Sequence, residues 1–391
     1  MYVLFFYPLT YYLERYMNVL LIDWSTIAYP SWEKMARKDY IAETGSEIVE
    51  FTRNIAKEAY YLTQRFAPNP DDLVYFLLDS KNWRVPYYDS YYRKFFKAWR
   101  VRNKQTKATG YFFTYDTYTY LLWDNHEPKG KELKLQDLKL SPKKLKELKP
   151  GLQRKEIEEP WTIERLKPWI PRYKGNRDDR KWAYDTSKET FKELRNKSAY
   201  SLGRTLNAKV IEIPGCEADD LVYAASIHHS ADNIICVSSD GDLDQIQNSV
   251  MFFRRWSPET ARRCFMDITP AAAGIKQNAM ILCGQPKDNI KPVTMGKTTI
   301  GEKKAYTIAE DVLNRGNVLN GPYTEHHSFR RNLKLVSLQH VPEKYLDLAA
   351  AGIKKGEVPE GEANHIKNYG LDKPAVMSTR RSAQTHREEN P

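Results

Sequence analysis

Aspartate follows a short apolar run at three places in this sequence, and these three residues are the first candidates for chemistry. The runs end at Asp23 after Val-Leu-Leu-Ile, at Asp79 after six residues that start with Leu73, and at Asp240 after Ser-Ser. Such runs are typical of strands that are buried on both faces of a sheet. Because ligand sites in open parallel sheets lie outside the carboxyl ends of the strands, we expect the three carboxylates to converge.

Further acidic residues lie next to the same predicted edge. A fourth strand leads through Pro-Gly to Glu217, Asp219 and Asp220 at the start of a helix, and Asp242 follows Asp240 by two residues. Carboxylates packed this closely repel one another and raise each other's pKa. A divalent cation removes that cost, and carboxylate oxygens without His or Cys favour magnesium, with manganese as a substitute. Two such ions would suit hydrolysis of a phosphodiester bond.

Each of these acids also has a simpler interpretation when it is taken alone. A single aspartate at a strand end is often a turn or N-cap residue, and Asp-Gly-Asp is common in loops. Asp219 and Asp220 could simply complement the dipole of their helix. The joint occurrence of acids at four predicted strand ends of one sheet is what favours a metal centre.

Alternating strands and helices must position these acids, and they predict an α/β fold with a central, mainly parallel sheet flanked by helices. Helices are expected over 46–66 and 185–205, between predicted strands. From Ala271 the pattern becomes helical, and a loop rich in Gly, Lys and Thr at 284–301 separates this helix from a second one over 302–314.

Four regions are predicted along the chain: an N-terminal extension (1–16), an α/β core (17–257), a helical C-terminal region (258–370) and a disordered tail (371–391). Residues 85–172 interrupt the core, with Tyr- and Trp-rich patches among Lys and Arg, and are interpreted as an insertion without a core of its own. Basic residues among aromatic ones suit single-stranded nucleic acid, and a protein-docking surface is the alternative.

Composition narrows the class of protein. The chain has 391 residues and a formal net charge of +11, which favours a polyanionic partner such as nucleic acid or an anionic membrane surface. The sequence has no amphipathic helix suited to a membrane surface, no cleavage pattern of a signal peptide and no long uncharged apolar run, so no membrane partner is expected. Four cysteines without metal-site spacing indicate reduced thiols in a cytoplasmic protein.

Several segments resemble the flap-endonuclease, or 5′-nuclease, superfamily. They are LLIDWS at 20–25, FLLDSKNWR at 76–84, YKGNR at 173–177, GCEADDLVYAAS at 215–226, VSSDGDLDQI at 237–246 and the stretch 282–305. The likeness is nearest to the phage 5′→3′ exonucleases of the T-even ribonuclease H type. Its most specific part is the combination of EADD with a following SSDGDxxQ.

The resemblance implies a site with two magnesium ions and basic residues that clamp the scissile phosphate. The implied ligands are Asp23, Asp79, Glu217 and Asp219 for one ion, Asp240, Asp242 and Asp288 for the other, and Asp220 in or near the coordination sphere. The implied clamp on a helical arch consists of Arg84, Lys174 and Arg177, with Lys81 as a further contact to nucleic acid. Basic residues there would neutralise charge in the transition state, although they could equally be solvated surface.

The resemblance also implies a helix–two-turns–helix DNA-binding module over 282–305, often with a bound potassium ion. The residues that would grip a duplex phosphate are Gly296, Lys297, Gly301, Lys303 and Lys304. An ordinary helix hairpin with a solvated lysine face is the alternative for this segment.

Two departures from the family pattern stand out. Gln285 occupies the place of the first aspartate in Gly-Asp-x-x-Asp, and an amide is a weaker ligand for the second metal. The insertion at 85–172 enlarges the arch region, and the Tyr-Tyr-Arg-Lys at 91–94 competes with 173–177 as the match to the arch.

The function implied is a metal-dependent 5′→3′ exonuclease or flap endonuclease acting on DNA or RNA–DNA hybrids. It would remove RNA primers and 5′ flaps during phage DNA replication, as a monomer in the host cytoplasm. The implied partners are duplex DNA with a 5′ flap or RNA primer, and a single-stranded DNA-binding protein or other replication proteins. The alternatives are a junction-binding protein that keeps the fold with weakened catalysis, and a ribonuclease of the related PIN type, which lacks the helix–two-turns–helix module.

Overall fold

The computed structural model describes most of the chain between Met17 and Pro359. The described residues are 17–35, 47–95, 97–115, 118–123, 140–148, 150, 152–156, 173–174, 188–254, 263–295, 298–315, 319, 322–357 and 359. The predicted N-terminal extension and C-terminal tail lie outside these residues.

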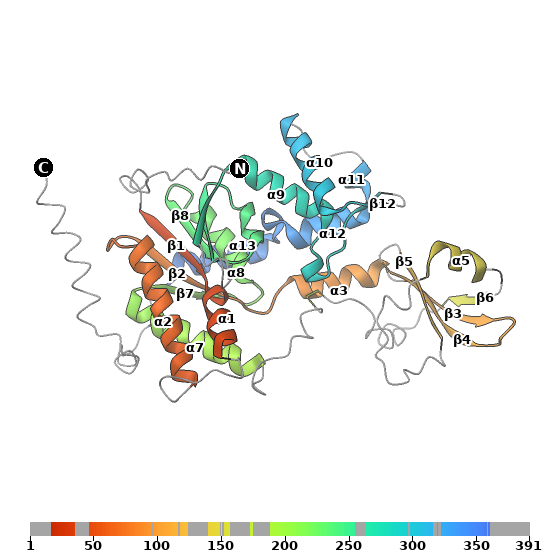
Figure 1. The fold of residues 1–391 in the computed structure, drawn as a ribbon, viewed down its shortest axis with the longest axis horizontal. Helices are drawn as coiled ribbons and strands as arrows, with labels where there is room; N and C mark the ends of the chain where they lie inside the picture. Colours follow the sequence, from red (N-terminus) through yellow and green to blue (C-terminus); the bar gives the residue numbers. More distant parts are fainter. Residues whose placement is uncertain are drawn as a thin grey trace, which may run out of the picture.

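A six-stranded sheet forms the centre of the molecule (Figure 1). Its strands, in spatial order, are β10 (Arg263–Ile268), β9 (Ser249–Arg254), β8 (Asn233–Ser238), β1 (Asn18–Asp23), β2 (Leu73–Leu78) and β7 (Lys209–Glu212). All neighbouring pairs are parallel except β9 and β10. The mainly parallel sheet predicted from the sequence is confirmed, and the four predicted strands are β1, β2, β7 and β8.

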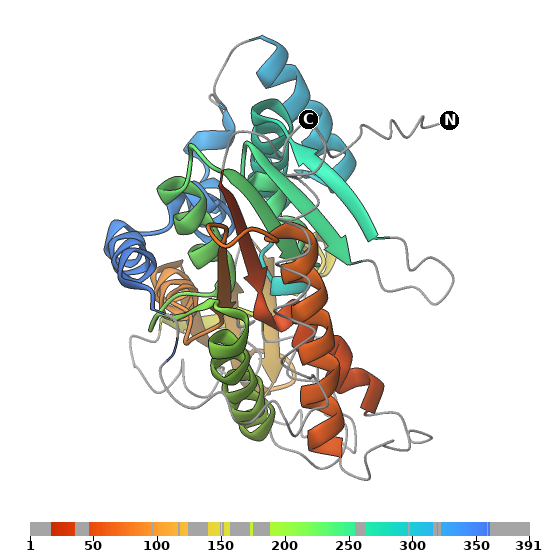
Figure 2. The ribbon, with the colours of Figure 1, turned by 90° about the vertical axis from the view of Figure 1, so that its left-hand side faces the viewer.

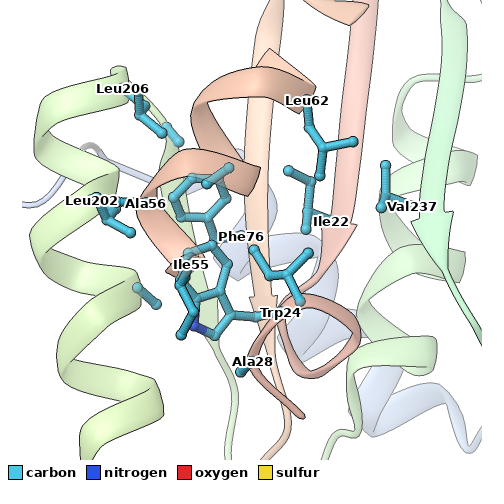
Figure 3. Close-up of a cluster of buried hydrophobic side chains, with 14 of the residues drawn as sticks. Ile22, Trp24, Ala28, Ile55, Ala56, Leu62, Phe76, Leu202, Leu206 and Val237 are labelled. Carbon is cyan, nitrogen blue, oxygen red and sulfur yellow. The ribbon is translucent and has the colours of Figure 1, made fainter. Parts of the chain in front are cut away.

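Helices cover both faces of this sheet (Figure 2). One face packs against α1 (Trp24–Met35), α2 (Glu47–Phe66) and α7 (Lys188–Leu206), and the other against α8 (Ala218–His228) and α13 (Glu343–Lys355). Figure 3 shows side chains of β1, β2, α2 and α7 meeting in one apolar cluster. Burial of apolar surface, at roughly 25 cal/mol per Å², is the main stabilising contribution of such a cluster.

The periodicity of α2 explains why this segment is a helix with one buried face. Phe51, Ile55, Leu62 and Phe66 recur at intervals of four or seven residues, and all four are buried against the sheet. The helix ends at Phe66, two residues before Pro68, whose ring disfavours helical geometry in the residue before it.

The C-terminal region contains the predicted helix pair. α9 (Pro270–Cys283) packs on α10 (Glu302–Asn314), and the loop between them holds a 3₁₀ turn (Pro286–Asp288) and the short strands β11 (Thr294–Met295) and β12 (Thr298–Thr299). The chain continues through α11 (Pro322–Glu325), α12 (His327–Val336) and a 3₁₀ turn (Leu338–His340) to α13.

Gly284 ends α9 in a conformation that requires glycine. Its φ is +66°, and an added Cβ would lie 2.4 Å from the carbonyl oxygen of Ile290. This close approach lets the chain turn sharply, so that the 3₁₀ turn after it reaches the end of β8.

The insertion differs in part from the predicted helical arch. α3 (Arg84–Phe95) is helical, but it is followed by the strands β3 (Lys97–Asn103), β4 (Thr109–Tyr115), β5 (Tyr118–Trp123) and β6 (Leu152–Glu156), with the short helix α5 (Pro142–Leu148). The strands form an antiparallel sheet in the order β5-β4-β3-β6. The described residues of 97–156 are referred to below as the β-insertion, which lies beyond the far end of α3 from the main sheet (Figure 1). Its aromatic and β-branched residues favour strands over helix.

The β-insertion has a small core of its own, which the sequence pattern did not predict. Val101, Phe112, Leu121 and Leu140 are buried together on one face of its sheet. Side chains on the opposite face, including Tyr111, belong to a larger apolar cluster that also contains residues of α3 and α9. No helix in the described part of the chain is long and apolar enough to cross a lipid bilayer.

Candidate active site

Three aspartates from neighbouring strands lie at the carboxyl edge of the main sheet, as the sequence predicts. β1 lies between β2 and β8, so Asp23 at the end of β1, Asp79 after β2 and Asp240 after β8 lie at the ends of three adjacent parallel strands. Asp23 is close enough to the other two carboxylates for their negative charge to affect its pKa. Burial is the largest cause that raises the pKa of Asp23 to about 7, followed by repulsion from Asp79 and Asp240. Hydrogen bonds from Ser238 and Thr26 act in the opposite direction and lower this pKa.

Small hydroxyl side chains hold the carboxylate of Asp23 in place. Its Oδ2 accepts hydrogen bonds from Thr26 Oγ1 and Ser238 Oγ, both at 3.0 Å, and its Oδ1 accepts one from the backbone N–H of Ser25 at 3.1 Å. These donors come from the start of α1 and the end of β8. The carboxylate therefore has a fixed orientation at the edge without a cationic partner among these contacts.

Arg195 binds Asp79, and the sequence pattern did not identify it. The Arg195 Nη1 lies 3.3 Å from Asp79 Oδ2, and its Nη2 donates to the Asp79 carbonyl oxygen at 3.1 Å. Ser25 Oγ donates to Asp79 Oδ2 at 2.6 Å, and the Ala218 N–H donates to Oδ1 at 3.0 Å. Burial alone would raise the pKa of Asp79, but Arg195 and these hydrogen bonds lower it below its usual value.

A sequence signal for Arg195 exists in the periodicity of α7. Phe191, Ala199 and Leu202 define the buried stripe of this helix, and Arg195 falls on the same stripe while only 4% exposed. A charged residue at such a position needs a buried partner.

The start of α8 delivers Glu217, Asp219 and Asp220 to the same edge. Glu217 is the N-cap residue, and Asp220 completes a capping box by accepting a hydrogen bond from the Glu217 N–H at 3.0 Å. The strand β7 and the Pro-Gly turn after it bring this helix start beside Asp79, whose carboxylate accepts from the Ala218 N–H. The predicted convergence of these acids therefore appears in the structure.

Asp220 and Arg84 form a buried pair. Arg84 Nη1 and Nη2 lie 2.9 Å and 2.7 Å from the two oxygens of Asp220, and Trp83 Nε1 donates to the same carboxylate at 3.2 Å. Arg84 also donates to the Leu335 carbonyl oxygen at 3.0 Å. The side chains are 2% and 1% exposed. Both predicted site residues are thus engaged inside the protein, where Arg84 fixes the start of α8 and does not face solvent.

Lys174 lies among the carboxylates. Its Nζ forms an ion pair with Glu217 Oε1, and Tyr173 OH donates to Glu217 Oε2 at 3.4 Å. The backbone of Lys174 is left-handed, with φ of +57°, and its N–H donates to the Asp288 carbonyl oxygen at 3.1 Å. Burial would lower the pKa of Lys174, but Tyr173 and the surrounding carboxylates raise it well above its usual value. The third predicted clamp residue, Arg177, lies outside the described residues.

Asp219 carries the least compensated charge of the α8 acids. Glu217 is paired with Lys174 and Asp220 with Arg84, whereas Asp219 Oδ1 accepts a hydrogen bond from the backbone N–H of Asp220, at 3.2 Å. Burial, and then repulsion from Glu217, raise the pKa of Asp219 well above the usual value, although Arg84 and Lys174 act in the opposite direction.

Lys287 lies between Asp240 and Asp242. Its Nζ is 2.6 Å from Asp240 Oδ1 and 3.1 Å from Asp242 Oδ2. Burial would raise the pKa of Asp240, but Lys287 lowers it. Burial and repulsion from Asp240 nevertheless raise the pKa of Asp242 to about 6. Gln285 also forms a hydrogen bond with Asp242, and the predicted ligand Asp288 is buried in the same turn, 2% exposed.

The predicted contacts to duplex phosphate are exposed where the structure describes them. Gly301 is the N-cap of α10, nothing lies within 4 Å of a Cβ built on it, and Lys303 and Lys304 in the first turn of that helix face solvent. Lys81, after β2, is also exposed. Gly296 and Lys297 lie outside the described residues.

The donor set of the edge suits a hard divalent cation, but the side chains do not form a ready-made metal site. Oxygen ligands dominate, and the raised pKa values of Asp23 and Asp219 reflect burial and like-charge repulsion that a cation would relieve. Among the described residues, no group of three or more His, Cys, Asp or Glu side chains is arranged to hold a metal ion. Lysine ammonium groups instead lie against several of the carboxylates.

No protein-family model matches the chain, and no curated protein matches it. Solved structures of bacteriophage T5 proteins show a limited likeness. A T5 protein co-crystallised with metal ions is 18% identical with a TM-score of 0.44, covering 86% of this chain and 98% of that one. A T5 flap endonuclease in complex with DNA and metal ions is 18% identical with a TM-score of 0.45, and the match covers 86% of this chain and 98% of that one. A T5 5′-exonuclease with bound zinc is 18% identical with a TM-score of 0.45, and the match covers 88% of this chain and 100% of that one. A likeness of this extent does not establish a family or an activity for this chain.

Proposed function

We propose that this protein is a divalent-metal-dependent nuclease that hydrolyses phosphodiester bonds near the 5′ ends of DNA or of RNA in RNA–DNA hybrids. The observation that carries the proposal is the meeting of Asp23, Asp79 and Asp240 with the acidic start of α8 at one edge of a parallel sheet. The fold itself has no need for so many carboxylates in one place, and like-charge repulsion makes the arrangement costly without a cation.

The residues divide into ligands and positioning groups under this proposal. Asp23, Asp79, Glu217 and Asp219 would hold a magnesium ion, which would lower the pKa of a bound water and stabilise negative charge on the phosphate. Ser25, Thr26 and Ser238 orient Asp23, and Arg195 orients Asp79. Arg84 and Asp220 hold the start of α8, so we assign both a positioning role and not one in binding metal or phosphate.

Among the described residues, Lys174 is a basic side chain placed to contact a phosphate. It is 25% exposed and its ammonium group already lies at the acidic edge. If Glu217 binds a metal, the ammonium group is released from its ion pair and becomes available to neutralise charge on the scissile phosphate.

The distribution of basic residues supports a nucleic acid as the substrate. Residues 85–172 contain 20 of the 61 Lys and Arg residues of the chain but 11 of its 50 Asp and Glu residues, so most of the basic surplus lies in the insertion. Lys143, Lys144 and Lys146 on α5 are exposed, as are Lys303 and Lys304 on α10. Exposed cations on two separate elements would bind phosphates at two places along a long ligand.

A cleavage assay tests the proposal. The full chain is incubated with 5′-labelled flap, nicked-duplex and RNA–DNA hybrid substrates, with magnesium and with a chelator. We expect magnesium-dependent cleavage near the 5′ end, and its loss in Asp23→Asn, which removes a charge without an ion-pair partner at the edge. Absence of cleavage on every substrate, or cleavage that Asp23→Asn leaves intact, would contradict the proposal.

A second candidate function is a junction-binding protein that retains the fold with weak or no catalysis. The engagement of the carboxylates by Lys174 and Lys287, and the amide of Gln285 beside Asp242, favour it. Such a protein would bind the flap substrate and leave it uncut in magnesium and in manganese.

The biological setting is an extension of the same proposal. We propose a monomer in the host cytoplasm that removes RNA primers and 5′ flaps during phage DNA replication. A single-stranded DNA-binding protein is a partner consistent with that task. A potassium ion in the loop between α9 and α10 belongs to the same set of proposals. The predicted division of the chain at 257 is not kept, because it separates β9 from β10, which pair in the central sheet.

A further inference from the structure

The loop between α9 and α10 contributes a lysine to the acidic edge. The 3₁₀ turn Pro286–Asp288 places Lys287 so that its single ammonium group contacts Asp240 and Asp242 together, at 2.6 Å and 3.1 Å. An ammonium group that bridges two carboxylates in this way occupies the place of a cation bound between them and neutralises one of their two charges.

Gln285 strengthens this arrangement from the same loop. Its side chain is 7% exposed and is hydrogen-bonded to Asp242. Asp240, Asp242 and Asp288 already act on Lys287, so a carboxylate at this position would have added a fourth negative charge, whereas the amide adds none. Asp240, Asp242 and the buried Asp288 of the same turn carry three negative charges, of which Lys287 neutralises one, so this group attracts a divalent ion less strongly than it would without the lysine or with a carboxylate in place of Gln285.

The carboxylates on the other side of the site are compensated less completely. Neither Asp23 nor Asp219 forms an ion pair within the part of the chain that the structure describes, whereas Asp240 and Asp242 share Lys287. The edge is thus divided into one group that still needs a cation and one that already holds a cation of the protein's own.

We infer that Lys287 takes the place of one of two divalent ions, so that the site binds one divalent ion tightly and not two. This inference rests on the proposed function, since it assumes that the remaining carboxylates bind a metal. It concerns the number of ions and the residue that sets it, and it applies to a nuclease and to a binding protein alike.

Manganese binding to the full chain tests the inference without any measurement of activity. Free Mn²⁺ is counted by electron paramagnetic resonance during titration, for the wild type, Lys287→Ala, Lys287→Arg and Lys291→Ala. Lys291 is exposed and lies in the same loop, so Lys291→Ala removes an equal charge without touching the carboxylates. We expect about one tightly bound ion in the wild type, Lys287→Arg and Lys291→Ala, and about two in Lys287→Ala.

The outcomes separate this inference from the proposed function. Two tight ions in the wild type, or one in both the wild type and Lys287→Ala, would overturn the inference and leave the metal site in place. Two ions in Lys291→Ala would also overturn it, because a general loss of positive charge would then explain the gain. If no variant binds manganese, the proposed function fails as well. Lys287 is 45% exposed, so its replacement should leave the fold intact, which circular dichroism checks.

Discussion

The acidic sheet edge and the β-insertion differ in whether their charged side chains are paired inside the protein or exposed to solvent. At the edge, several of the buried or half-buried carboxylates form ion pairs with basic side chains inside the protein, such as Arg84 and Arg195. In the β-insertion, Lys143, Lys144 and Lys146 project from a seven-residue helix into solvent. Internal pairing gives a rigid arrangement of ligands, whereas exposed charge gives adaptable, salt-dependent attraction. Under the proposed function, the first region would carry out chemistry at a fixed point and the second would hold a long polyanion.

The largest expected effect comes from removing a charge at the edge. Asp219→Asn should lower the cleavage rate by about 10²-fold or more, because one of the four proposed metal ligands is lost. Asp244→Asn is the control: Asp244 pairs with Lys276 at 3.6 Å and is not among the proposed ligands. Single-turnover rates on the 5′-flap substrate measure both. Equal losses in the two variants would remove the distinction between a catalytic edge and its acidic surroundings.

The second prediction concerns the buried pair that supports the edge. Arg84→Met leaves Asp220 buried without its cation and should lower the free energy of unfolding by about 3–5 kcal/mol. The double variant Arg84→Met/Asp220→Leu should recover part of this loss, because no unpaired charge remains. Urea denaturation of the three proteins gives the values. A phosphate-clamping Arg84 would instead lower activity with little change in stability, which is the result that contradicts the positioning role.

A smaller effect is expected from the β-insertion. Changing Lys143, Lys144 and Lys146 to glutamate should weaken binding to a flap substrate and make that binding less sensitive to salt. The slope of log affinity against log salt concentration should fall by roughly one for each phosphate that the protein no longer neutralises. Fluorescence anisotropy at several salt concentrations measures both quantities.

Lys354→Glu with Lys355→Glu on α13 is the control for this charge reversal, since both of these lysines are also exposed. The control should bind the flap substrate nearly as tightly as the wild type. An equal weakening in the control would mean that total charge, and not the β-insertion, determines affinity.

The smallest effect should distinguish the two regions by their response to acid. His229, at the far end of α8, is held by Tyr75 OH at 3.0 Å and by Asp232 at 3.2 Å, and burial lowers its pKa below 6.5. Because the folded state then prefers the neutral ring, the stabilising contribution is complete above pH 6.5 and is lost as the pH falls through that value towards the lowered pKa. Thermal unfolding should therefore shift to lower temperature in mild acid.

His229→Gln should remove part of that shift. The described residues of the β-insertion contain no histidine, so any separate unfolding of that region should be insensitive over the same pH range. A wild-type melting temperature that stays constant between about pH 7 and pH 5.5 would contradict the role given to His229.

The core was accessible to prediction because local patterns and global packing agree there. β2 spans Leu73–Leu78 and α10 spans Glu302–Asn314, as expected from an apolar run and from helical spacing. The strand-end position of Asp23, Asp79 and Asp240 followed from the same runs, because parallel strands present their carboxyl ends to one edge. Motif spacing added Glu217 and Asp219 at the start of α8.

The β-insertion and the partners of the acids were not accessible in the same way. The aromatic and basic residues of 97–156 carry no helical periodicity, and their pairing into four strands depends on contacts between segments far apart in the chain. Arg195 lies 116 residues from its partner Asp79, and Arg84 lies 136 residues from Asp220. A sequence pattern can show that such charges need partners, but not which partners they find.

The sequence by itself therefore determined the type of sheet, the helices that flank it and the acids at its edge, since each of these follows from apolar periodicity and strand-end position. Only the tertiary structure decided how those acids are neutralised. It places Arg84 inside the protein, Lys174 beside Glu217 and Lys287 between Asp240 and Asp242, because ion pairing depends on distances set by packing between distant elements.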